Sequence, residues 1–65
     1  MIMTKYKVMA KEKHDKRFHC YGNHTEAYHA DKNAESLANS LWTKEVKIIV
    51  KDDNGIENEI TYKAA

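Results

Sequence analysis

The pattern of hydrophobic and polar positions is clearest in the last third of the chain. Residues 46–51 and 56–62 are rich in β-branched side chains interspersed with polar ones, which is typical of strands, and a turn sequence separates them. The Asp-Asn-Gly sequence at 53–55 suits a three-residue hairpin loop whose glycine adopts the left-handed region as a bulge. The pattern therefore predicts a β-hairpin in which Asp52 faces Ile56.

This hairpin register assigns the side chains to two faces of a sheet, because cross-strand partners point to the same side. The face predicted to be buried carries the pairs Val46–Tyr62, Ile48–Ile60 and Val50–Asn58. The opposite face carries the pairs Lys47–Thr61, Ile49–Glu59 and Lys51–Glu57. A slip of one residue would mix the two faces, so the register is strongly specified.

The amino-terminal part predicts three more strands. Residues 5–11 alternate, with Tyr6, Val8 and Ala10 on one side and the lysines on the other. Residues 17–21 and 24–29 follow as strands, and the intervening Gly-Asn is a two-residue hairpin signal. This arrangement places Phe18, Cys20, Thr25 and Ala27 on the inner face. The outer face carries Arg17, His19, Tyr21, His24, Glu26 and Tyr28.

A helix is predicted where the period changes. Asp31 is a suitable N-cap, and an apolar stripe at helical spacing follows at Ala34, Leu37, Ala38 and Leu41. Docked on the inner face of the strands, this helix gives an α+β domain: an antiparallel sheet of about five strands, with one helix packed on one face, in the order β-β-β-α-β-β. Cys20, Leu37, Leu41 and Ile48 are expected to be buried together.

Length and composition limit the function classes. A chain of 65 residues without a linker-like segment is predicted to form one domain over residues 1–65, too small for a large catalytic cavity. The net charge of +1 does not indicate a strong nucleic-acid binder. Charge is nevertheless divided, since residues 1–22 carry six Lys and Arg against two acids and residues 23–65 carry five against eight. One cysteine and the lack of an apolar span predict a cytoplasmic protein.

Metal binding and catalysis are not favoured by the sequence. The histidines recur every five residues, at 14, 19, 24 and 29, but this spacing matches no zinc signature and distributes them over both faces and a loop. A diagonal pair of His19 and His24 is the remaining alternative for an adventitious divalent metal. Cys20 is expected in an apolar setting, which disfavours a reactive thiolate. We therefore expect no enzyme activity, no metal and no cofactor.

The helix-free face of the sheet is the predicted binding surface, because cations, aromatic rings and apolar anchors alternate on it. Its candidate residues are Lys5, Lys7, Met9, Arg17, His19, Tyr21 and Tyr28. The first hypothesis is a small cytoplasmic binding protein that docks a protein partner, or a second copy of itself, through this face. The alternative is a nucleic-acid-binding module that uses Lys5, Lys7, Arg17, Tyr21 and Tyr28. An enzyme subunit completed at an oligomer interface is a third hypothesis, and an ordinary solvated face is the simplest reading.

The order of elements resembles that of many small bacterial and phage domains, in which strands, an Asp-capped helix rich in alanine and a final strand ending at a turn follow one another. The first hypothesis therefore includes a protein encoded by a phage or mobile element. The resemblance carries no functional residue that could be transferred to this chain.

Overall fold

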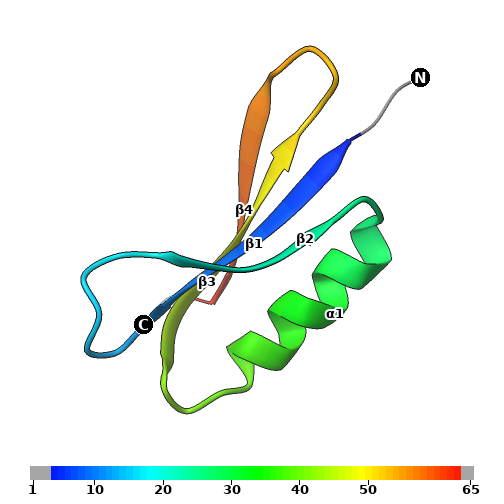
Figure 1. The fold of residues 1–65 in the computed structure, drawn as a ribbon. Coiled ribbons are helices and arrows are strands. Elements are labelled where there is room, and N and C mark those ends of the chain that lie inside the picture. The colour runs from blue at the N-terminus through cyan, green and yellow to red at the C-terminus, as the bar shows by residue number, and fades with distance from the viewer. Residues whose placement is uncertain (1–3, 64–65) are drawn as a thin grey trace.

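The computed structural model describes residues 4–63 as one antiparallel sheet with a helix packed against one face (Figure 1). The elements are β1 (Lys5–Glu12), β2 (His19–His24), α1 (Ala27–Ala38), β3 (Thr43–Lys51) and β4 (Glu57–Lys63). The strand order across the sheet is β2-β1-β3-β4. The first strand is therefore central, and it pairs with both its neighbour in sequence and the distant β3.

The predicted fold class is wrong in the number and order of strands. The sheet described has four strands in the order β-β-α-β-β, because the segment 24–29 does not form a third strand. His24 ends β2 and α1 begins at Ala27, so Asp31 lies in the second turn of the helix and is not its cap. The apolar stripe of the helix extends back to the buried Ala30, one turn before Ala34, and this longer helical period outweighs the weak alternation over six residues.

The β3–β4 hairpin has the predicted loop. Gly55 has a φ of 81°, which is the left-handed region expected of a bulge. The side chain of Asp52 accepts hydrogen bonds from the backbone N–H of Asn54 at 2.9 Å and of Ile56 at 3.0 Å. The pairs Lys51–Glu57, Val50–Asn58, Ile49–Glu59, Ile48–Ile60 and Lys47–Thr61 are confirmed. The predicted Val46–Tyr62 pair is wrong, because the register shifts beside Lys47 and Val46 faces Lys63.

The predicted hairpin at Gly22-Asn23 does not form, and β2 pairs with β1 instead. The register shifts between Val8, which faces Gly22, and Met9, which faces Cys20, so Tyr21 is an extra residue in a bulge. Gly22 lies within the strand and not in a turn. A Cβ at this glycine would stand 2.2 Å from Asn33 Nδ2 of α1, so glycine permits the close approach of helix and strand.

The core of the described residues is small. Its buried hydrophobic members come from β1, β3 and α1, namely Val8, Ala10, Ala30, Ala34, Val46 and Ile48. Several residues predicted to be buried are exposed, namely Cys20, Ala27, Leu41, Ile60 and Tyr62. Leu41 is 82% exposed because α1 ends at Ala38. Leu37 packs against the core but remains partly accessible. Alanines on the buried side of α1 allow the helix to lie close to the sheet.

Candidate binding surface on the helix-free sheet face

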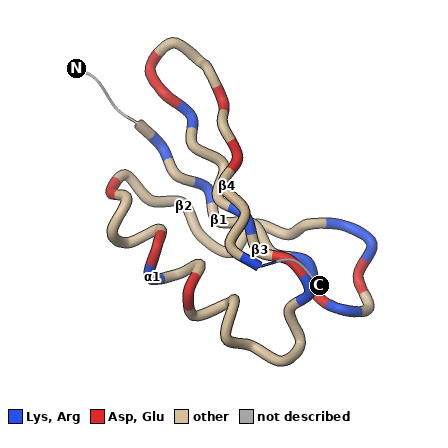
Figure 2. Tube along the Cα trace, turned by 180° about the vertical axis from the view of Figure 1, so that it is seen from behind, with Lys and Arg blue, Asp and Glu red and all other residues tan. Residues whose placement is uncertain are grey.

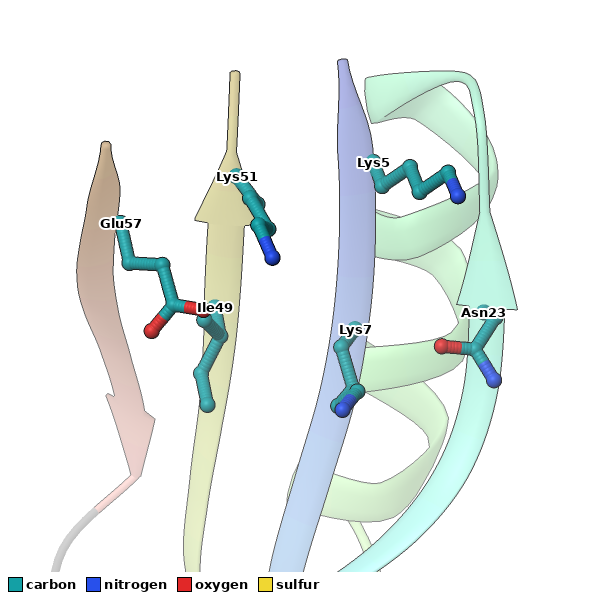
Figure 3. A pocket seen from close by; sticks show the side chains of 6 residues that line it. All are labelled: Lys5, Lys7, Asn23, Ile49, Lys51 and Glu57. Carbon is teal, nitrogen blue, oxygen red and sulfur yellow. The ribbon is translucent and has the colours of Figure 1, made fainter. Parts of the chain in front are cut away.

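A depression of about 410 Å³ lies on the helix-free face, at the end of the sheet where β1 begins (Figure 3). Side chains from all four strands line it, namely Lys5, Lys7, Asn23, Ile49, Lys51 and Glu57. We call this group the lysine pocket. Its lining combines three ammonium groups, one amide, one carboxylate and one aliphatic side chain.

The strand registers explain why these residues meet. Alternation along β1 places Lys5 and Lys7 on the side opposite the core residue Val8. Across the sheet, Lys5 faces Lys51, whereas Lys7 lies between Asn23 of β2 and Ile49 of β3. Two like charges stand directly opposite each other in this arrangement, which destabilises a sheet in the absence of an anion. The lysine pocket is therefore a site where the protein concentrates positive charge.

The other lysines of this face are neutralised by carboxylates. Lys47 Nζ lies 3.3 Å from Glu59 Oε1, and Lys11 Nζ lies 3.6 Å from Glu45 Oε1. Both ammonium groups also lie over the ring of Phe18, at 4.2 Å for Lys47 and 5.4 Å for Lys11. Between residues 4 and 63, no carboxylate forms an ion pair with the three lysines of the pocket.

The distribution of charge along the chain also favours a positive lysine pocket. Lys and Arg gather along β1 and in the β1–β2 loop, whereas Asp and Glu gather on α1 and the β3–β4 hairpin (Figure 2). Glu57, the single carboxylate of the lysine pocket, faces Lys51 across the hairpin without an ion-pair contact. A positive end of the face is thus bordered by an acidic hairpin tip.

The structure divides the predicted binding residues between different surfaces. Lys5, Lys7 and Met9 lie on the helix-free face as predicted, and Lys5 and Lys7 line the pocket. Arg17 lies in the loop before β2, and Tyr28 lies on α1 because the third strand does not exist. The predicted single surface of seven residues is therefore wrong in its geometry.

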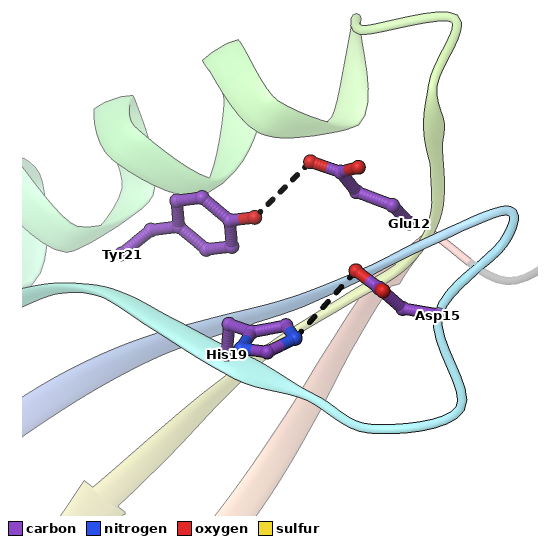
Figure 4. Close-up of polar contacts among 4 residues, drawn as sticks. All are labelled: Glu12, Asp15, His19 and Tyr21. Carbon is purple, nitrogen blue, oxygen red and sulfur yellow. Dashed lines mark hydrogen bonds and ion pairs between the residues drawn. The ribbon is translucent and has the colours of Figure 1, made fainter.

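His19 and Tyr21 belong to the helix side of the sheet, not to the predicted outer face. His19 pairs with the core residue Ala10, and its Nε2 lies 3.5 Å from an oxygen of Asp15 (Figure 4). The Tyr21 hydroxyl donates a hydrogen bond of 3.3 Å to Glu12 Oε1, on the side of α1. Partial burial and the neighbouring Glu12 carboxylate raise the pKa of Tyr21 above its ordinary value. The bulge in β2 causes the exchange of faces, and it also moves Phe18 and Cys20 outward.

Four residues that line the lysine pocket are absent from the predicted binding residues, namely Asn23, Ile49, Lys51 and Glu57. The predicted hairpin register already placed Lys51 and Glu57 on the helix-free face. Their closeness to Lys5, however, depends on the pairing of β1 with β3. No turn connects those two strands, so local sequence does not specify their register. Asn23 was assigned to a turn, whereas in the structure it faces Lys7.

The four histidines do not converge. His14 lies in the β1–β2 loop, His24 Nε2 lies 3.0 Å from Asn33 Nδ2, and His29 lies on α1 near Glu26. Among the residues that the structure describes, no three His, Cys, Asp or Glu side chains lie where they could hold one metal ion. No helix within 4–63 is long and apolar enough to cross a bilayer.

Comparisons with protein-family models, with curated proteins and with solved structures give no match to this chain. Its class is therefore defined by its own geometry: a small α+β domain with a lysine pocket on the open face of its sheet.

Proposed function

We propose that this chain is a small, non-enzymatic binding module that docks an acidic segment of a protein partner in the lysine pocket. One observation carries the proposal: Lys5, Lys7 and Lys51 gather around a depression without ion-pair partners among the described residues. The cross-strand neighbours Lys5 and Lys51 repel each other in the free protein. A bound carboxylate would relieve this repulsion and add charge-assisted hydrogen bonds.

The chemistry of the pocket favours a glutamate- or aspartate-rich peptide over a free inorganic anion. Ile49 is partly buried and offers an aliphatic contact beside the ammonium groups. The amide of Asn23 can donate to and accept from a peptide backbone. A ligand with carboxylates and short aliphatic stems satisfies all three kinds of group.

Nucleic-acid binding is less well supported by the positions of the aromatic rings. A platform for single-stranded nucleic acid requires rings on which bases stack. Tyr21 and Tyr28 lie away from the helix-free face, and the ring of Phe18 is covered by Lys11 and Lys47. The remaining lysines would contact phosphates without reading bases.

The experiment compares two variants of equal charge. The pocket variant carries Lys5→Gln, Lys7→Gln and Lys51→Gln, and the control carries Lys13→Gln, Lys16→Gln and Arg17→Gln in the exposed β1–β2 loop. Binding of a fluorescent glutamate-rich peptide and of a single-stranded oligonucleotide is measured by anisotropy at two salt concentrations. We expect the pocket variant to bind the peptide at least about tenfold more weakly than the parent, which corresponds to ~1.4 kcal/mol.

Equal losses in both variants would show that only net charge matters and would contradict the proposal. If the parent bound the oligonucleotide more tightly than the peptide, and this affinity fell steeply with salt, the result would support the nucleic-acid alternative instead. Thermal melting of the three proteins separates loss of binding from loss of fold.

A cytoplasmic location belongs to the same proposal. Cys20 is an exposed free thiol. Such a group persists in a reducing compartment, whereas in an oxidising one it would form intermolecular disulfides.

A further inference from the structure

The two edge strands of the sheet, β2 and β4, differ in whether another strand could pair with their outer side. On β2, the bulge at Tyr21 interrupts the edge, and Asn33 Nδ2 of α1 donates a hydrogen bond of 3.4 Å to the Tyr21 carbonyl. On β4, no described residue pairs with the outer edge. Helix α1 lies behind β1 and β2 in Figure 3, packs on β3 through Ala30 and Ala34, and reaches β4 at the hydrogen bond between Tyr62 and Asp31. It therefore covers β4 only in part. Consequently Ile60 is 50% exposed and Tyr62 is 40% exposed on the helix side.

The backbone of β4 presents free hydrogen-bonding groups at alternate residues. The N–H of Asp52 donates to the carbonyl of Ile56 at 3.1 Å, so this is a hydrogen-bonded pair of the hairpin. Alternation along an antiparallel ladder then directs the N–H and C=O of Glu57, Glu59 and Thr61 away from β3. These groups form a template for another antiparallel strand.

We propose that two copies of this chain associate by pairing their β4 strands antiparallel about a two-fold axis at Ile60. This register pairs the regular part of both strands around Ile60, up to Thr61, beyond which the register shift at Tyr62 interrupts β4. It joins the two sheets into one of eight strands. The lysine pocket lies mainly on β1 and β3, so each copy keeps its pocket open and the inference does not depend on the proposed function.

Like charges and the bulge in β4 disfavour the neighbouring registers. With the axis at Ile60, Glu59 of one copy faces Thr61 of the other within the regular part of the strand. An axis at Thr61 would place the bulge residue Tyr62 opposite Ile60 and so interrupt the ladder. An axis at Glu59 would place that carboxylate against its own copy, and an axis at Asn58 would oppose Glu57 to Glu59. Like charges in direct opposition destabilise a sheet.

The same register buries the exposed apolar groups of β4. At the axis, Ile60 faces Ile60 of the second copy in a pair without direct hydrogen bonds, where side chains come closest. Tyr62, the extra residue of the β4 bulge, lies beside this pair on the helix side, and its hydroxyl donates a hydrogen bond to Asp31 of its own α1. In the dimer, the exposed side chains on the helix side of β4 in one copy are therefore covered by those of the other copy.

Sedimentation over a range of concentrations tests the association. We expect the parent to shift from monomer to dimer as concentration rises and Ile60→Lys to remain a monomer, since two ammonium groups would meet at the axis. Leu41→Lys is the control, because Leu41 is 82% exposed but lies outside β4, and this variant should dimerise like the parent. A parent that is monomeric throughout, one that forms larger open assemblies, or an Ile60→Lys dimer would overturn the proposal.

Cross-linking tests the register and does not depend on the folding of Ile60→Lys. In a Cys20→Ser background, Ile60→Cys should form a disulfide-linked dimer under mild oxidation, because the two positions are adjacent at the axis. Asn58→Cys, on the same strand and also exposed, should cross-link far more slowly, since its counterpart lies four positions away along the ladder. Faster cross-linking at position 58 than at position 60 would contradict the register.

Discussion

The two hairpins of this sheet are held in register by different parts of the molecule. In β3–β4, a three-residue loop fixes the register through Gly55 and through two hydrogen bonds to the side chain of Asp52. In β1–β2, residues 13–18 form a long polar loop, and the bulged strand is held by contacts with α1. One hairpin is specified by its own sequence, whereas the other depends on the tertiary fold.

The difference has a physical basis in loop length and steric restriction. A short loop with a residue at positive φ leaves few backbone solutions, so only one register is compatible with it. A longer loop admits several registers, and packing then selects among them. Mutations in the two hairpins should therefore differ in whether their effects depend on α1.

The largest effect is expected from Gly22→Val in β2. A Cβ at this position would lie 2.2 Å from Asn33 Nδ2 and 2.8 Å from His24 Nε2, so the helix side chain must move and lose its hydrogen bonds. We expect the free energy of unfolding to fall by about 2–3 kcal/mol, measured by chemical denaturation. Adding Asn33→Ala should restore part of this loss, and strictly additive effects would show that Gly22 does not depend on α1.

The next largest effect is expected from Gly55→Ala in the β3–β4 loop. No atom lies within 4 Å of the added Cβ, so the cost arises from the positive φ alone and should be about 1 kcal/mol. Gly55→Asn should cost less, because asparagine tolerates this region better. Unlike Gly22→Val, the Gly55→Ala loss should be unchanged in an Asn33→Ala background. If the losses in unfolding free energy from Gly55→Ala and Asn33→Ala were not additive, the β3–β4 hairpin would also depend on α1, and the contrast between the hairpins would be wrong.

Asp52→Ala should destabilise the protein by roughly 0.5–1.5 kcal/mol, because the backbone N–H groups of Asn54 and Ile56 lose their side-chain acceptor. Asp52→Asn is the matched control, since its amide oxygen retains the acceptor. Urea denaturation of both variants separates the hydrogen bonds from the negative charge. Equal losses in the two variants would assign the effect to charge.

The smallest effect concerns alkaline pH and compares the two outer strands. The hydrogen bond to Asp31 raises the pKa of Tyr62, and burial beside Glu12 raises the pKa of Tyr21. A raised pKa in the folded state means that the neutral phenol contributes stability below its ordinary pKa of about 10, and this contribution is lost as pH rises through the folded-state value.

Melting temperatures between pH 8 and pH 11 measure this contribution. Tyr62→Phe and Tyr21→Phe should each flatten the alkaline fall in Tm, because each removes one ionisation linked to folding. Tyr6→Phe provides a tyrosine control from the central strand. An unchanged alkaline slope in both test variants would contradict the role of these hydroxyl groups.

The parts of the fold that could be predicted are those encoded within a few neighbouring residues. The alternation in β1, the loop at Gly55 and five pairs of the β3–β4 ladder follow from local period and turn chemistry. The bulge at Tyr21 could not be predicted, since nothing in the local alternation marks an extra residue there. The helical spacing of Ala30 from Ala34 was a readable sign of the earlier helix start, but the short alternation after Gly22 obscured it.

The candidate site was predictable to a similar extent. Alternation places Lys5 and Lys7 on the open face, whereas their proximity to Lys51 follows from the long-range pairing of β1 with β3. The aromatic residues assigned to the same face depended on the register of β2, and the bulge removed Tyr21 from it. A binding surface built across strands distant in sequence is therefore less predictable than the strands themselves.

The central position of β1 also determines the order in which the fold can be completed. The core residues Val8 and Ala10 need Val46 and Ile48 of β3, which emerge from the ribosome long after β1. Until then the growing chain can form the β1–β2 hairpin and α1, but one edge of β1 has no partner. Late closure of this pairing predicts slower folding than a helical domain of equal length would show, and exposes a nascent strand to capture by chaperones during synthesis.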